Sequence, residues 1–142
     1  MNKLILLVDD DAGVRGSLRA VLVSEGYEVV SAKDGQEALD MVSASEVDLV
    51  LLDLNMPVKN GWDTFERLTT QHPLTPVIII TARPNQLFTA LCAGVGALLE
   101  KPLDMTRLLE TVNDLLAESA ESRLARITGR NVKFNYQPSP TN

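Results

Sequence analysis

The 142-residue chain has one cysteine, Cys92, and one histidine, His72. A single cysteine excludes an internal disulfide, and a single histidine disfavours a zinc site. No apolar run is long enough for a transmembrane helix, and the start of the chain turns acidic too soon for a signal peptide. The chain also lacks internal repeats and low-complexity segments. We therefore expect a globular protein of the cytoplasm.

Charge is distributed unevenly along the chain. The net charge is −6, yet residues 120–142 carry +3, because four basic residues there stand against Glu121. Residues 1–119 therefore carry −9. An acidic body disfavours non-specific binding of nucleic acid, and we expect neither nucleic acid nor a membrane as a direct partner. Hydrophobic residues make up 45% of the chain, enough for the core of one ordinary domain.

Short apolar runs alternate with amphipathic stretches. The runs predict strands near residues 4–8, 27–32, 48–53, 76–81 and 97–100. Two of them, 48–53 and 76–81, are almost wholly apolar, which is typical of strands covered on both faces. Three predicted helices follow Asp11, Asp34-Gly35 and Asn60-Gly61. A fourth is predicted over residues 85–94, and a fifth begins at Asp104. Five such units in series indicate an α/β protein with a parallel sheet and right-handed crossovers.

The pattern weakens after about residue 119. Apolar residues at helical spacing predict that the fifth helix continues to about Gly129. The segment from Phe134 to Asn142 contains two prolines, and we expect it to be disordered. We therefore divide the chain into a domain of residues 1–119 and a tail of residues 120–142. Removal of this tail is expected to leave thermal stability nearly unchanged.

Polar residues stand where the predicted strands end. Asp9 and Asp10 follow the first strand, Asp53 the third, Thr81 the fourth and Lys101 the fifth. If the strands are parallel neighbours, these residues meet at one edge of the sheet, where open α/β sheets bind ligands. Neighbouring carboxylates repel one another, and a divalent cation relieves that repulsion. Mg²⁺ fits best, because it accepts one or two carboxylates, a phosphate oxygen and several waters.

Each of these residues has a plainer explanation when taken alone. Adjacent aspartates occur in solvated turns and helix caps, and Asp53 could cap a loop. Thr81 could follow from β-propensity, and Lys101 could be a surface lysine. Together they offer a carboxylate that can attack a phosphoryl donor, with a hydroxyl and an ammonium for the phosphoryl oxygens. A cis bond before Pro102 would turn Lys101 back toward this site.

The motifs that contain these residues are Val-Asp-Asp-Asp, Leu-Leu-Asp-Leu-Asn-Met-Pro, Ile-Ile-Thr-Ala and Glu-Lys-Pro-Leu. Together, over about residues 3–119, they resemble the receiver domain of two-component response regulators, in a stand-alone form like the chemotaxis regulators. The resemblance implies a flavodoxin-like, doubly wound sheet of five parallel strands in the order 2-1-3-4-5, with five helices. It also implies Mg²⁺-dependent phosphorylation by a histidine kinase or a phosphotransfer protein.

The resemblance also assigns roles to residues. Asp53 is the expected phosphoacceptor, and Asp9, Asp10 and Asp53 are the expected Mg²⁺ ligands, joined by the backbone carbonyl of Asn55. Phosphatases of the haloacid dehalogenase type also form an aspartyl phosphate. In those enzymes a second aspartate, two residues after the nucleophile, acts as general acid. Because the chain has Asn55 there, that alternative is disfavoured.

Thr81 and Lys101 are expected to sense the phosphoryl group. Leu98 stands where many family members have Tyr or Phe, a ring that changes rotamer in the switch, and we expect no such swing of leucine. We expect a binding module rather than an enzyme, one that assists its own phosphorylation and dephosphorylation. Its output protein, which the sequence does not identify, would bind the face of the fourth helix, fifth strand and fifth helix. A phosphorelay intermediate and the receiver part of a DNA-binding regulator remain as alternatives.

Overall fold

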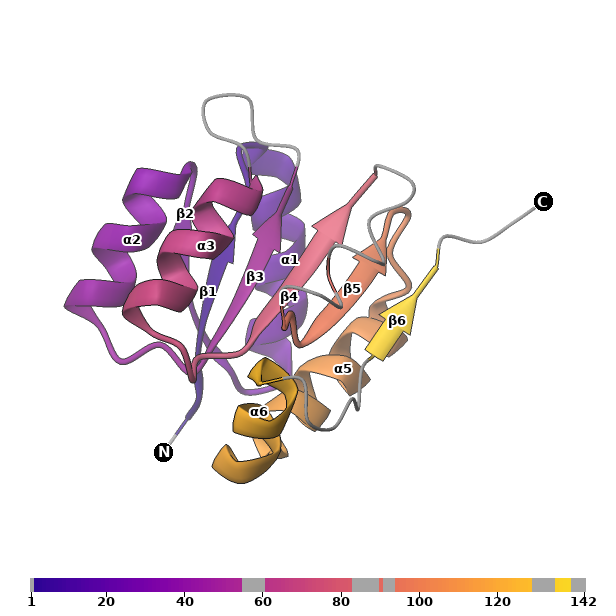
Figure 1. Ribbon diagram of the computed structural model, residues 1–142. Helices are drawn as coiled ribbons and strands as arrows, with labels where there is room; N and C mark the ends of the chain where they lie inside the picture. The colour runs from indigo at the N-terminus through magenta and orange to yellow at the C-terminus, as the bar shows by residue number, and fades with distance from the viewer. Residues whose placement is uncertain (1, 55–60, 83–89, 91–93, 129–134, 139–142) are drawn as a thin grey trace.

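A computed structural model describes residues 2–54, 61–82, 90, 94–128 and 135–138 (Figure 1). Its strands are β1 (Leu4–Val8), β2 (Glu28–Ala32), β3 (Leu49–Asp53), β4 (Val77–Thr81), β5 (Ala97–Glu100) and β6 (Asn135–Gln137). Its helices are α1 (Ala12–Ser24), α2 (Gly35–Ala44), α3 (Gly61–Gln71), α5 (Met105–Ala117) and α6 (Ala120–Ile127). The helix predicted over 85–94 falls largely outside the described residues. Of that stretch, Ala90 is helical and buried, and Gly94 has the positive φ of 75° that suits a helix end.

All six strands pair in parallel, in the order β2-β1-β3-β4-β5-β6. The flavodoxin-like fold and the strand order 2-1-3-4-5 are therefore confirmed, and the five-stranded sheet of the prediction is corrected to six strands. Helices α1 and α5 cover one face of the sheet, and α2 and α3 cover the other (Figure 1). Because β3 and β4 lie in the middle under both layers, every residue of these two strands is buried.

Side chains of the central strands alternate between two cores. On β3, Leu52 packs toward α2 and α3, whereas Leu51 packs toward α1 and α5. Leu98 on β5 belongs to the first of these cores and has no exposed surface. The expected helix starts are present as well: the side chain of Asp11 accepts hydrogen bonds at the start of α1, and that of Asp104 does so at the start of α5.

The tail differs from the prediction in two ways. Helix α5 ends at Ala117, and α6 begins as a separate helix with Ser119 as its N-cap, so the fifth helix does not continue to residue 129. Residues 135–137, expected to be disordered, form β6 beside β5. Helix α6 is held by Arg126, which is buried and forms an ion pair with Glu118. A buried arginine and a three-residue strand have no periodic sequence signal, which is why the pattern did not predict them.

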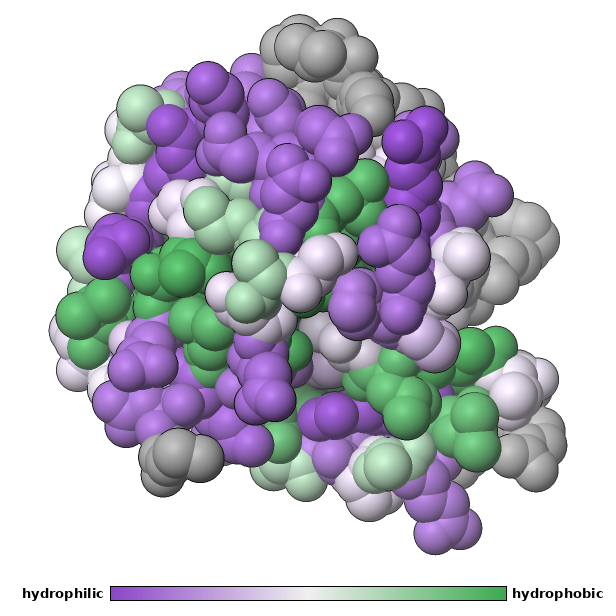
Figure 2. All heavy atoms as spheres, turned by 90° about the vertical axis from the view of Figure 1, so that its left-hand side faces the viewer, coloured by the Kyte–Doolittle hydropathy of each residue, from purple (hydrophilic) through white to green (hydrophobic). Residues whose placement is uncertain are grey.

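The surface seen in Figure 2, on the side where α2 lies, is largely hydrophilic, with a few hydrophobic residues grouped among the hydrophilic ones. Within the described ranges the large exposed hydrophobic residues are Val23, Leu74, Met105, Leu124 and Ile127. No helix in the described part of the chain is long and apolar enough to cross a membrane.

Two glycines predict opposite effects of the same substitution. A Cβ atom on Gly35 would lie 2.2 Å from Oγ1 of the buried Thr64, where α2 meets α3. Gly35→Ala is therefore expected to destabilise the protein by about 1–3 kcal/mol through overpacking. Gly16 lies on the exposed side of α1 with nothing within 4 Å of such an atom, so Gly16→Ala is expected to stabilise by about 0.5–1 kcal/mol. Urea unfolding of both variants measures this, and a stabilised Gly35→Ala protein would contradict the close α2–α3 contact.

Candidate functional site

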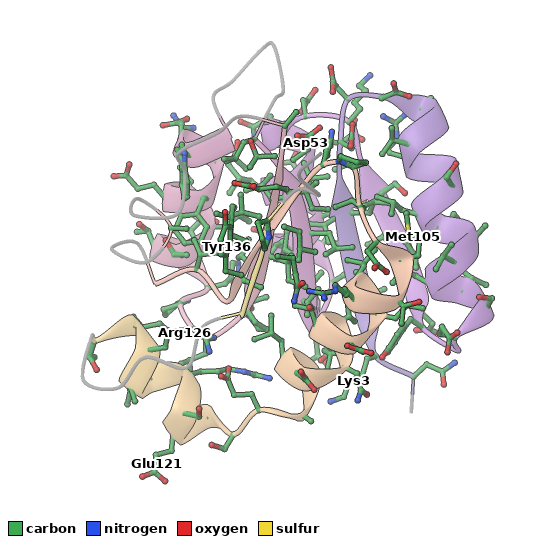
Figure 3. All side chains as sticks on the ribbon, turned by 90° about the vertical axis from the view of Figure 1, so that its right-hand side faces the viewer. Lys3, Asp53, Met105, Glu121, Arg126 and Tyr136 are labelled. Atoms are coloured by element: carbon green, nitrogen blue, oxygen red, sulfur yellow. The ribbon has the colours of Figure 1, made fainter. Side chains whose placement is uncertain are left out.

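The site lies at the C-terminal edge of the sheet, where Asp53 ends β3 (Figure 3) and two aspartates follow the last residue of β1. Asp53 is the last residue of β3 and is 3% exposed, and Asp9, directly after β1, is 2% exposed. Asp10 beside it is exposed. Each of the three offers one carboxylate oxygen, and these three oxygens lie within 4.8 Å of one another. The structure thus brings the three predicted metal ligands together.

Backbone and side-chain donors fix Asp9 in place. The backbone N–H of Asp11 donates to Oδ1 of Asp9 at 2.9 Å, and Nη1 of Arg15 donates to the backbone oxygen of Asp9 at 2.7 Å. Asp11 therefore both caps α1 and orients the neighbouring carboxylate. The sequence indicated the cap but not this second role, and it gave no signal for Arg15.

The carboxylates crowd one another. Burial raises the pKa of Asp9 from 3.8 to about 6, although the hydrogen bond from Asp11 lowers it, and the negative charge of Asp53 raises it further. A negative charge on Asp9 is thus unfavourable in the protein alone. A hard divalent cation with oxygen ligands would relieve this repulsion, so the donor set fits Mg²⁺.

Lys101 reaches the same edge from the end of β5. Its Nζ atom lies 3.2 Å from Oδ2 of Asp53, and its side chain is 29% exposed. The Lys101–Pro102 peptide bond, the candidate for cis geometry in the sequence, is cis. The backbone N–H of Lys101 donates to the carbonyl of Thr81 at 2.8 Å, and Thr81 is fully buried at the end of β4. The structure therefore brings Thr81 and Lys101 to the same edge as Asp53.

Asn55, the other predicted metal ligand, lies outside the described residues, as does Cys92. Sequence reasoning missed Tyr136 of β6, which stands in register with Leu98, the predicted switch position. The Tyr136 hydroxyl bonds to the side chain of Glu100, one residue before Lys101. The aromatic side chain was the one sequence feature that could have drawn attention to Tyr136. It points to the site only once β6 is known to pair with β5, and the hydrophobic pattern did not predict that pairing.

Comparison with known proteins adds family information. The family model described as response regulator receiver domain matches residues 5–113. The transcriptional regulatory protein CpxR of Escherichia coli strain K12 is 44% identical over 121 residues, which cover 84% of this chain and 51% of that protein. The chain therefore spans about half the length of this curated relative.

Solved structures show the same likeness. A CheY-like response regulator receiver domain protein of Methanospirillum hungatei superposes with a TM-score of 0.78 at 30% identity, covering 82% of this chain and 94% of that one. The response regulator TrrA of Thermotoga maritima, solved in complex with Mg²⁺ and BeF, has a TM-score of 0.74 at 30% identity. That match covers 80% of this chain and 98% of the relative.

Proposed function

The chain belongs to the family of response regulator receiver domains, and we propose that it is a phosphorylation-controlled receiver whose phosphoacceptor is Asp53. The donor would be a histidine kinase or a phosphotransfer protein. The observation that carries this proposal is the 3.2 Å contact between Nζ of Lys101 and Oδ2 of Asp53, made beside two further carboxylates. If Asp53 served only to cap a loop, it would need neither an ammonium partner nor a buried side chain.

In the proposed reaction, an oxygen of Asp53 attacks the phosphorus atom of a phosphohistidine. The new O–P bond forms as the N–P bond to the donor imidazole breaks, and that nitrogen keeps the bonding electrons. Lys101, whose Nζ contacts Oδ2 of Asp53, would pair with a phosphoryl oxygen, and Thr81, which directly follows the register partner of Asp53 on β4, would donate its hydroxyl to another. Mg²⁺ held by Asp9, Asp10 and Asp53 would supply charge neutralisation for the phosphoryl oxygens. Attack by water on the phosphorus of the aspartyl phosphate would break its bond to the Asp53 oxygen, release inorganic phosphate and restore the carboxylate.

The output is also a matter of proposal. The half-length match to CpxR favours, as a second candidate, a receiver that controls a DNA-binding output region. In both cases the chain acts as a switch that assists its own phosphorylation and dephosphorylation rather than as an enzyme with a separate substrate. The expected output face includes β5 and α5, and in this structure β6 pairs with the outer edge of β5.

Phosphoryl uptake tests the assignment of Asp53. Incubation with acetyl phosphate and Mg²⁺ is expected to add one phosphoryl group to the wild-type chain, measured by intact mass, and none to Asp53→Asn. Asp114→Asn, which changes an exposed carboxylate on α5, is the matched control and is expected to label like the wild type. Labelling that persists in Asp53→Asn would rule out Asp53 as the acceptor.

A further inference from the structure

Strand β6 changes the position of β5 in the sheet. Tyr136 pairs with Leu98 and Gln137 with Leu99, so β5 has a partner on both sides, β4 and β6. Without β6, the outer backbone groups of β5 would lose these partners, and β5 would become an edge strand within the described part of the sheet. Lys101 follows the last residue of β5 directly. The placement of Lys101 therefore depends on a strand that β6 supports.

Tyr136 makes a second connection. Its ring is half-buried against the core that contains Leu98, and its hydroxyl bonds to the side chain of Glu100. Burial, followed by the negative charge of Glu100 and a hydrogen bond with its side chain, raises the pKa of Tyr136. In this hydrogen bond the tyrosine O–H is the donor and the carboxylate is the acceptor. In Figure 3, Tyr136 lies on β6 partway along the sheet, and Asp53 lies at the upper end of the sheet.

Glu100 lies between this tyrosine and the phosphorylation site. It pairs in register with Thr81 of β4, and the next residue, Lys101, donates its backbone N–H to Thr81. The Lys101 side chain then contacts Asp53. A continuous series of contacts thus runs from the tail strand, through Glu100 and Lys101, to the phosphoacceptor.

We propose that Tyr136 is a positioning residue for the phosphorylation site, which holds Glu100 and β5 so that Lys101 stays against Asp53. This inference rests on the proposed phosphorylation of Asp53. When β6 is paired, β5 holds the Lys101 ammonium against Asp53 before any phosphoryl group is present. A paired β6 therefore favours phosphorylated Asp53, because the ammonium that meets the phosphoryl group is already ordered. By reciprocity, modification of Asp53 strengthens the pairing of β6 by the same factor.

Two tyrosine variants of the full chain test the proposal. Tyr136→Phe removes the hydroxyl and keeps the ring, and Tyr27→Phe makes the same change at a half-buried tyrosine that packs in the other core. Beryllofluoride with Mg²⁺ serves as the phosphoryl mimic, and its binding midpoint is followed by fluorine NMR. The midpoint is expected to rise about threefold to tenfold in Tyr136→Phe, as for loss of one hydrogen bond to a charged group, and to stay unchanged in Tyr27→Phe.

Hydrogen exchange of the peptide that contains residues 135–137 gives the reciprocal measurement. Beryllofluoride is expected to slow this exchange in the wild type and in Tyr27→Phe, and to slow it less in Tyr136→Phe. A purely structural role of Tyr136 would change exchange equally with and without the mimic, and that result would overturn the proposal. Equal midpoints for all three proteins would also overturn it, while leaving the receiver function intact. Wild-type protein that neither binds beryllofluoride nor takes a phosphoryl group from acetyl phosphate would overturn both proposals.

Discussion

Replacing Asp9 by asparagine is expected to stabilise the metal-free protein at pH 7.5 by about 1–3 kcal/mol. The same substitution is expected to abolish phosphorylation that requires Mg²⁺. Burial raises the pKa of Asp9 from 3.8 to about 6, so the charged carboxylate destabilises the fold at neutral pH. The asparagine side-chain oxygen can still accept the hydrogen bond from the backbone N–H of Asp11. The substitution therefore removes the unfavourable charge and keeps the local geometry, but it also removes a ligand of the proposed cation.

The sign of the pH dependence follows from linkage. Between about pH 4 and pH 6 the folded protein holds a proton on Asp9 that the unfolded chain has lost, so stability falls as the pH rises through this window. The advantage of Asp9→Asn is therefore expected to be full above pH 6 and to vanish near pH 4. Urea unfolding in EDTA at both pH values measures it. Asp10→Asn, at an exposed carboxylate, is the control that loses the cation with little gain in stability. An Asp9→Asn protein less stable than wild type at pH 7.5 would contradict the unfavourable charge.

The second large effect is expected at Glu118, between α5 and α6. Its carboxylate pairs with Nη1 of Arg126 and lies 3.5 Å from Nε of Arg123, and the Arg126 side chain is 5% exposed. Glu118→Gln leaves this buried guanidinium without a counter-charge, which costs about 3–5 kcal/mol in comparable sites. In Glu118→Gln, α6 can separate from the domain rather than keep the unpaired guanidinium buried. The loss of unfolding free energy therefore cannot exceed the free energy with which α6 packs on the domain.

Thermal unfolding and hydrogen exchange separate these two responses. Glu118→Gln is expected to lower the melting temperature by several degrees and to make α6 exchange rapidly. The control is Glu121→Gln, at an exposed glutamate on the first turn of α6, where a change within about 0.5 kcal/mol is expected. If the two variants unfold alike, the buried pair does not hold α6. From the sequence, removal of residues 120–142 was expected to leave thermal stability nearly unchanged, whereas the Glu118–Arg126 ion pair predicts that their removal lowers it.

The parts that could be predicted from sequence depend on local signals. Apolar runs marked strands β1 to β5, and an aspartate marked the start of α1. The site followed because parallel strands bring their ends together, which placed Asp9, Asp53 and Lys101 at one edge. These signals are read within a few residues of the chain, so no knowledge of distant contacts was needed.

The parts that could not be predicted depend on distant contacts. β6 consists of Asn-Tyr-Gln, which has no run of apolar residues, and its pairing is decided by β5, more than thirty positions earlier. Arg126 is buried against the usual preference of arginine for solvent, because Glu118 neutralises it. The raised pKa of Asp9 likewise comes from burial that only the assembled sheet creates.

The place of β6 at the border of the sheet has a consequence for self-association at high protein concentration. An exposed border strand is a template onto which a strand of another molecule can add, and long flat strands are the most vulnerable. The border formed by β6 is three residues long and is followed at once by Pro138, which has no N–H to continue a ladder. The longer β5 is covered by this short strand, so the chain limits aggregation through this side of its sheet.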